Sequence, residues 1–237
     1  MTKINEAMIF AAGLGKRMLP LSEKIPKPLL SIKNKPIIFY IIEELIALNF
    51  KNIVVNCHHL PNQIIDRLKI FSPLVTVTVE KKILDTGGGV SRAIKMNYFT
   101  NLDQPILLIN GDIYWTKTKE SPIKNIIKNW NSKKMDLLVS IKKIKDFYGY
   151  KGKGDLEVLE KSKKLSKIKF YTGKDFVFTG LQIIKPKLVV EIKKEKFSMR
   201  EIFFSETKII YGALDENEWY HISTPNDLKL INKNLKT

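Results

Sequence analysis

Cysteine is almost absent from this sequence, because Cys57 is the only one among 237 residues. A single cysteine excludes an internal disulfide and is typical of proteins kept in a reducing compartment. The sequence also lacks an apolar run long enough to cross a bilayer, and its first residues lack the basic region, apolar core and cleavage site of a secretory signal. We therefore expect a cytoplasmic protein without a membrane partner.

Acidic residues are scarce relative to basic ones, 24 against 41, which gives a formal net charge of +17. Such an excess occurs in many nucleic-acid-binding proteins. Here the basic residues are mostly lysines spread along the whole chain, and we find neither an RNA-binding motif nor a helix-turn-helix pattern. We expect a solvated basic surface that also attracts anionic substrates, and no nucleic-acid partner.

Apolar β-branched runs alternate with amphipathic stretches in the first 142 residues. The predicted strands are 7–12, 52–56, 75–79, 106–110 and 136–141, and the predicted helices are 36–48, 61–70, 88–97 and 121–132. This alternation predicts an α/β fold, a Rossmann-like three-layer sandwich with a mainly parallel sheet. Ligands of such sheets bind beyond the carboxyl ends of the strands.

The pattern changes after about residue 143. Short strand-like segments at 156–159, 165–170 and 176–184 alternate with turns rich in glycine and lysine, and they predict a smaller antiparallel β section lying over the sheet. We expect residues 142–153 to form a loop or lid. Since no repeat or linker divides the chain, we predict one domain, 1–237, with halves of about 1–142 and about 143–237.

A glycine turn with two cations, Lys16 and Arg17, follows the first predicted strand, and Lys27 stands between two prolines ten residues later. Glycines let backbone N–H groups approach a phosphate closely, and the cations can neutralise a triphosphate. The spacing is not that of a P-loop. It is not the dinucleotide-binding fingerprint either, because Met18 stands where the third glycine belongs.

These motifs resemble those of the sugar-1-phosphate nucleotidylyltransferases, in which A-A-G-x-G-x-R and a following P-K-P bind the nucleoside triphosphate. The resemblance spans essentially the whole chain and includes L-D-T-G-G-G at 84–89, N-G-D at 110–112, F-T-G at 178–180 and W-Y-H-I-S-T-P at 219–225. Within the family, the first of these runs, the short length and F-S-M at 197–199 resemble most the N-acetylmuramate-1-phosphate uridylyltransferases of bacterial cell-wall recycling.

The resemblance implies an enzyme in which a sugar phosphate oxygen attacks the α-phosphorus of a nucleoside triphosphate and pyrophosphate leaves. Arg17 is expected at the pyrophosphate, Lys27 at the α-phosphate and Asp112 at a metal ion; these are the predicted catalytic residues. The first half would bind the nucleotide through Ala11, Ala12, Gly13, Gly15, Lys16, Arg17, Lys27, Asn56, Glu80, Gly87, Gly88 and Asp112. The sugar would be bound, mainly by the second half, through Asn110, Gly154, Asp155, Thr179, Gly180 and Gln182.

His221 is the main departure from the family, which has a second metal-binding aspartate there. Mg²⁺ prefers oxygen ligands and imidazole suits softer ions. Three interpretations stay open. His221 binds Mn²⁺ or Co²⁺ beside Asp112; it contacts a phosphate or a metal-bound water; or Asp112 and phosphate oxygens form the site alone. We expect Mg²⁺ as the cofactor, with Mn²⁺ or Co²⁺ as the alternatives.

The base and the sugar also stay open. Glu80 could accept hydrogen bonds from guanine, so a mannose-1-phosphate guanylyltransferase, or a heptose or choline phosphate analogue, stands beside the uridylyltransferase. The lysine of the E-K-P motif that holds the sugar phosphate in many relatives is missing, and Lys169 and Lys174 are candidate replacements. His221 and this missing lysine also leave an inactive nucleotide-binding regulator as an alternative. A monomer and a homodimer are both compatible with the sequence.

Overall fold

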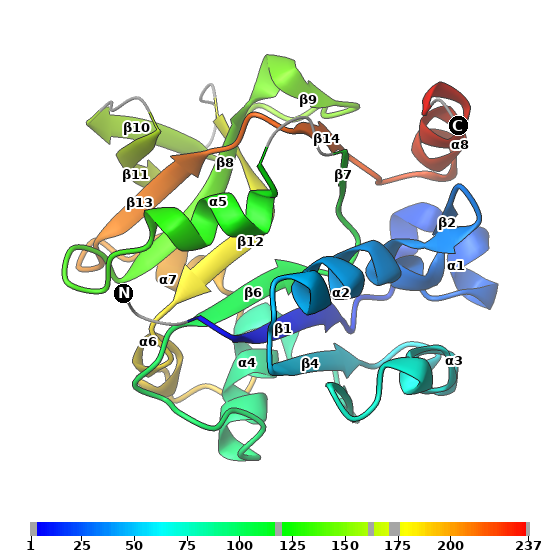
Figure 1. The fold of residues 1–237 in the computed structure, drawn as a ribbon, viewed down its shortest axis with the longest axis horizontal. Helices are drawn as coiled ribbons and strands as arrows, with labels where there is room; N and C mark the ends of the chain where they lie inside the picture. Colours follow the sequence, from blue (N-terminus) through cyan, green and yellow to red (C-terminus); the bar gives the residue numbers. More distant parts are fainter. Residues whose placement is uncertain (1–3, 117–119, 161–163, 171–175, 236–237) are drawn as a thin grey trace.

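A nine-stranded sheet forms the centre of the structure, a computed structural model that describes residues 4–116, 120–160, 164–170 and 176–235 (Figure 1). Its strands are β1 (Glu6–Ala11), β4 (Asn52–Cys57), β5 (Val75–Val79), β6 (Ile106–Asn110), β8 (Leu137–Lys143), β10 (Leu156–Glu160), β11 (Leu165–Phe170), β12 (Phe176–Ile184) and β13 (Ile210–Leu214). They lie in the order β10-β11-β13-β8-β12-β6-β1-β4-β5.

Two small sheets accompany the large one in the described part of the chain. The strands β7 (Tyr114–Thr116), β14 (Glu218–Tyr220) and β9 (Phe147–Tyr148) form one of them, and β2 (Ser31–Ile32) pairs with β3 (Lys35–Pro36) in the other. Short 3₁₀ helices lie at Lys16–Met18, Lys27–Leu29, Lys69–Phe71 and Ile144–Asp146.

Helices cover both faces of the large sheet. The buried side chains of α2 (Ile37–Ala47), α3 (Pro61–Leu68) and α5 (Pro122–Asn129) pack on one face, and those of α4 (Asp85–Lys95), α6 (Lys187–Val190) and α7 (Arg200–Phe203) pack on the other. α1 (Leu21–Lys24) follows the glycine turn, and α8 (Pro225–Asn234) packs on a third cluster. None of the described helices is both long and apolar enough to cross a membrane.

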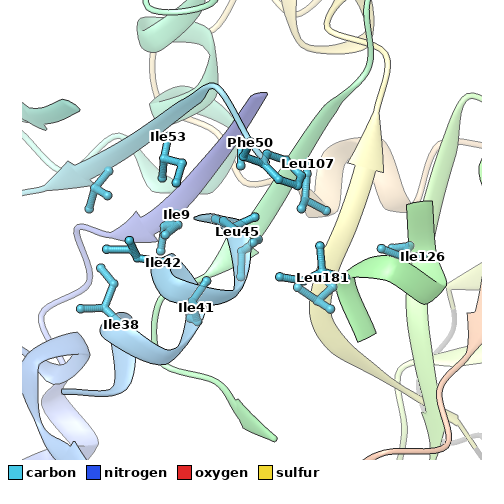
Figure 2. Close-up of a cluster of buried hydrophobic side chains, with 14 of the residues drawn as sticks. Ile9, Ile38, Ile41, Ile42, Leu45, Phe50, Ile53, Leu107, Ile126 and Leu181 are labelled. Atoms are coloured by element: carbon cyan, nitrogen blue, oxygen red, sulfur yellow. The ribbon is translucent and has the colours of Figure 1, made fainter. Parts of the chain in front are cut away.

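The period-two alternation of the strands divides the core into its two layers. Ile9 of β1 packs against the isoleucines of α2, as Figure 2 shows, whereas the preceding residue, Met8, belongs to the cluster on the α4 side. Both side chains are fully buried. Burial of one such side chain stabilises the fold by roughly 1.5–3 kcal/mol. The apolar runs therefore form a sheet that is buried on both faces, as predicted.

The fold class, an α/β Rossmann-like three-layer sandwich, is confirmed. The neighbouring strands β6, β1, β4 and β5 are parallel, and β12 runs antiparallel to both β6 and β8. The antiparallel strands continue the same sheet, so the expectation that they lie over it is wrong. Hydrogen bonding to β6 and β8 leaves β12 no free edge, which fixes it inside the sheet.

The loop predicted over 142–153 is also partly wrong. β8 extends to Lys143, and β9 pairs in parallel with β14. The reason is apolar burial, because Phe147 is 7% exposed and packs edge-on against Trp219 with ring centres 6.3 Å apart.

The glycines at 87–89 lie inside the first turns of α4, which begins three residues before the predicted helix 88–97. They are buried because the segment 195–197 passes directly over them. The Gly88 amide donates to the Phe197 carbonyl at 3.0 Å, and the Phe197 amide donates to the Leu84 carbonyl at 3.1 Å. These glycines therefore allow a close approach of two segments that lie more than 100 residues apart.

Gly88→Ala should destabilise the protein by about 1–3 kcal/mol, the cost of overpacking a tight contact. A Cβ at Gly88 would lie 2.4 Å from the Glu195 carbonyl oxygen, a backbone atom that cannot rotate away. In an unobstructed helix the same change would stabilise the protein instead. Urea unfolding measures whether the free energy of unfolding falls or rises. Lys95→Ala, at an exposed position of the same helix, is the control. An unchanged or raised free energy of unfolding would contradict the close contact.

Candidate active site

A cleft of about 330 Å³ opens at the carboxyl ends of β1 and β6. Eight predicted residues line it: Ala11, Gly13, Gly15, Lys16, Arg17, Lys27, Asn110 and Asp112. Phe10, Met18, Pro28, Thr86 and Ser223 complete its lining. The structure thus brings the glycine turn, the proline-flanked lysine and the aspartate after β6 into one cavity.

The glycine turn depends on Gly15, whose φ of 62° lies in the left-handed region. Its carbonyl accepts a hydrogen bond from the Ser22 hydroxyl at 2.9 Å, and a Cβ at this position would lie 3.1 Å from the Ser22 Cβ. The turn leads into the short helix that carries Lys16 and Arg17, both of which are exposed. Two exposed cationic side chains therefore extend from a backbone turn that is held in place at the entrance of the cleft.

Lys27 and Asp112 form an ion pair in this cleft, with 2.5 Å between Nζ and Oδ2. The Lys27 side chain is 11% exposed and that of Asp112 is 37% exposed. Flanking prolines restrict the backbone on both sides of Lys27. The pair therefore holds a positive charge and an oxygen ligand next to each other, the arrangement that a metal-bound phosphate needs.

His221 lies close enough to this pair to respond to its charges. Its pKa is lowered from the ordinary value of 6.5, first by burial and then by the positive charges of Lys27 and Arg17. Its ring packs edge-on against Phe147 and Tyr150, with centres 6.1 Å and 5.6 Å away. The imidazole is therefore neutral at neutral pH, the form that binds metals or accepts a hydrogen bond. His221 is nevertheless absent from the cleft lining.

Lys27→Met should raise the pKa of His221, because it removes a nearby positive charge. NMR titration of the ring protons measures the shift, and His221→Gln assigns the signal. Lys24→Met, at an exposed position, is the control and should leave this pKa unchanged. Because the folded-state pKa is lowered, His221 contributes stability that is present above pH 6.5 and is lost as pH falls through the folded-state pKa. A His221 pKa that is the same in the Lys27→Met protein and in the wild type would contradict the proximity of His221 to Lys27.

A divalent cation has one clear protein ligand in this cleft, the carboxylate of Asp112. Among the described residues, no group of three or more His, Cys, Asp and Glu side chains is arranged to hold a metal. Mg²⁺ commonly uses one or two carboxylates together with substrate phosphates, so a single aspartate beside a phosphate site fits it. His221 is the candidate for a second protein ligand.

Asn56 and Glu80 lie beneath the cleft and do not line it. Each is 2% exposed, and the Asn56 amide donates to the Glu80 carboxylate at 2.7 Å. Asn56 also accepts a hydrogen bond from the Ala11 amide, and Glu80 accepts one from the Leu84 amide. The pair therefore connects the end of β1 to the start of α4.

Gly87 and Gly88, predicted at the nucleotide, are covered by protein. A Cβ on Gly87 would lie 2.3 Å from the Phe197 ring, so the space beside it is already filled. Neither glycine lines the cleft, whereas Thr86 does. The sequence analysis did not single out Thr86, because a threonine before a glycine run carries no distinctive signal.

A second cavity of about 210 Å³ adjoins the first, because Thr86 and Asn110 line both. Asp155 and Gln182 line it as predicted, together with Phe170, Phe178, Ser198, Met199, Arg200, Phe203 and Phe204. The Asp155 carboxylate accepts a hydrogen bond from the Phe178 amide at 3.1 Å, and burial raises its pKa. Most of the remaining wall is apolar.

The other predicted sugar residues, Gly154, Thr179 and Gly180, do not line this cavity. The Thr179 hydroxyl donates to the Ser140 carbonyl, and Gly180 has a φ of 98° with Asn110 packed against it. We interpret them as residues that shape the cavity wall.

Lys169, one of the two candidate replacements for the missing lysine, does not line this cavity. Lys169 is exposed and pairs with Glu206 at 3.5 Å, and Lys174 lies outside the described residues.

Comparison with known proteins agrees with this geometry. The protein-family model described as nucleotidyl transferase matches residues 6–220. N-acetylmuramate alpha-1-phosphate uridylyltransferase of Caulobacter vibrioides is 24% identical over 92% of each chain. D-glycero-alpha-D-manno-heptose 1-phosphate guanylyltransferase of Aneurinibacillus thermoaerophilus is 24% identical over 98% of each chain. The structure of HddC from Yersinia pseudotuberculosis complexed with GMP-PN superposes with a TM-score of 0.76 at 25% identity, covering 98% of this chain and 100% of HddC.

Proposed function

Because the chain belongs to the nucleotidyl transferase family and is a sugar-1-phosphate nucleotidylyltransferase, we propose that it transfers UMP from UTP to N-acetylmuramate 1-phosphate. Pyrophosphate is the second product. The observation that carries the proposal is the pair of adjoining cavities, one lined by three cations and one lined by four phenylalanines, that share Thr86 and Asn110. The triphosphate fits the first cavity and the sugar fits the second.

Lys27 holds the α-phosphate in the proposed reaction, and Arg17 holds the leaving pyrophosphate. The sugar phosphate attacks in line from the junction of the cavities, where Asn110 and Thr86 offer polar side chains. Both reactants are anions, so the protein acts by orienting them and by neutralising their charge. Lys27 is nearly buried and paired, and it is therefore already in place before the substrates bind.

Asp112 is the residue that would hold the divalent metal ion, with Mg²⁺ as the expected ion. A bound metal would neutralise the charge on the phosphates. His221 is neutral, and its pKa responds to the charge of Asp112. Its imidazole would add a nitrogen ligand that favours Mn²⁺ or Co²⁺ over Mg²⁺.

GTP with a heptose 1-phosphate is the second candidate substrate pair, supported by the guanylyltransferase relative and by the GMP-PN complex of HddC. The predicted contact of Glu80 with guanine does not support it, since Glu80 is buried against Asn56. The four phenylalanines of the second cavity also suit the methyl group of an N-acetylated sugar.

We also propose that the enzyme acts in the cytoplasm, where nucleoside triphosphates are made, in the recycling of cell-wall sugars. A monomer and a homodimer are both compatible with these two cavities. The two halves, 1–142 and 143–237, would act as one unit because a single sheet runs through both.

Pyrophosphate release is the experiment that tests the proposed function. UTP, GTP and CTP are each combined with N-acetylmuramate 1-phosphate, heptose 1-phosphate, mannose 1-phosphate and phosphocholine, in Mg²⁺, Mn²⁺ and Co²⁺. We expect the highest kcat/KM with UTP and N-acetylmuramate 1-phosphate. A higher value for a GTP pair would transfer the assignment to the second candidate, and faster turnover in Mn²⁺ than in Mg²⁺ would support His221 as a ligand.

A further inference from the structure

Arg200 supplies the only lysine or arginine side chain among the described residues that line the second cavity. It begins α7, is exposed, and its guanidinium lies 5.1 Å from the centre of the Phe204 ring. In the described part of the chain, no carboxylate lies within ion-pair distance of it. Arg200 interacts electrostatically with the Asp155 carboxylate of the same cavity but makes no ion pair with it. This cation, oriented by an aromatic ring, can therefore still pair with an anionic ligand.

Four phenylalanines line the same cavity. Phe170 and Phe203 stack with ring centres 4.4 Å apart, and Phe178 meets Phe203 edge-on at 5.5 Å. Such a wall favours methyl groups and the C–H face of a sugar ring over a shell of hydroxyl groups.

Gln182 adds one unsatisfied polar group to this wall. It is 2% exposed, and its Oε1 has no hydrogen-bond partner among the described residues. A buried polar atom without a partner is costly, so a ligand that donates a hydrogen bond would be favoured there.

We infer, on the basis of the proposed function, that Arg200 selects a sugar 1-phosphate that carries a carboxylate on the body of the sugar. The phosphate of the substrate must reach the α-phosphorus and therefore lies at the junction formed by Thr86 and Asn110. Arg200 lines the second cavity and not the first. The anionic group that it binds is therefore not the phosphate of the sugar. A carboxylate for Arg200, methyl groups for the phenylalanines and an amide N–H for Gln182 together describe an N-acetylated sugar acid.

The test compares two substrates that differ only in the carboxylate-bearing group. N-acetylmuramate 1-phosphate carries a lactyl ether that N-acetylglucosamine 1-phosphate lacks. With UTP, the wild-type kcat/KM should be higher for the first. Arg200→Met should lower the ratio of the two kcat/KM values about 10- to 100-fold, the usual range for losing a charge-assisted hydrogen bond. The loss should fall mainly on KM, and Arg200→Lys should restore part of the ratio.

Lys193→Met is the matched control, because it removes an exposed positive charge from the segment that precedes α7. It should leave the ratio unchanged. If Arg200→Met lowers kcat/KM equally for both sugars, or leaves the ratio of the two kcat/KM values unchanged, Arg200 does not have this role. The proposed function would still hold. A wild-type protein that releases no pyrophosphate with any pair would overturn the proposed function, and the inference with it.

Discussion

Lys27→Met should lower kcat about 10²- to 10³-fold, the usual loss when one preorganised donor to a developing charge is removed. Lys27 holds its ammonium group 2.5 Å from the Asp112 carboxylate in a nearly buried position, and methionine keeps the length of the side chain without its charge. Because the charge is in place before the substrates bind, its loss should affect turnover more than substrate affinity. Single-turnover release of pyrophosphate with saturating UTP and sugar 1-phosphate measures the effect.

Lys24→Met provides the control, since it removes the same charge from an exposed lysine of α1. Its kcat should stay within a factor of two or three, as expected for a surface charge. Thermal unfolding of both variants shows whether either has lost its fold. A folded Lys27→Met protein with nearly normal kcat would exclude Lys27 from the mechanism.

The convergence of the predicted phosphate-binding residues on one cleft follows from where the strands end in the sequence. The apolar runs at β1 and β6 are each followed by polar or glycine residues, and the carboxyl ends of parallel strands meet at one edge of a sheet. Hence Arg17 and Asp112, 95 positions apart in the sequence, could be assigned to one site, and the structure places both in one cleft. Their chemical roles stay predictions.

Strand order could not be predicted in the same way. The run 176–184 is apolar almost throughout because β12 is buried on both faces, and such a run looks the same in a parallel and an antiparallel strand. Its antiparallel pairing with β6 and β8 joins segments up to 78 positions apart in the sequence. The periodicity of a single strand carries no information about such partners.

Contacts between distant segments also explain the other misses. Gly87 and Gly88 are predicted to contact the nucleotide, but the segment 195–197 packs on them. Arg200 stands beside Glu201 in the sequence and looks like the solvent-facing residue of a helix. Its place at the second cavity follows from how α7 packs against Phe170 and Phe178, which a local pattern does not show.

Asp112→Asn should lower kcat/KM about 10³-fold in saturating Mg²⁺, because the metal would lose its one clear protein ligand in the cleft. A bound metal contributes several kcal/mol of charge stabilisation, and each 1.36 kcal/mol corresponds to a factor of ten. Asp136→Asn is the matched control. Asp136 pairs with Lys185 at 2.9 Å but lies just before β8, at the opposite edge of the sheet. The Asp136→Asn protein should be less stable than the wild type and should keep its kcat/KM.

Binding of UTP without metal separates the two roles that Asp112 could have. If Asp112 binds the metal, the Asp112→Asn protein should bind UTP more tightly than the wild type in EDTA, because a negative charge beside the phosphates is gone. In Mg²⁺ the order should reverse. If Asp112 served only to hold Lys27 in place, the variant would bind UTP more weakly in both conditions. Calorimetric titrations with and without Mg²⁺ decide between these outcomes, and weaker binding in EDTA would contradict the metal site.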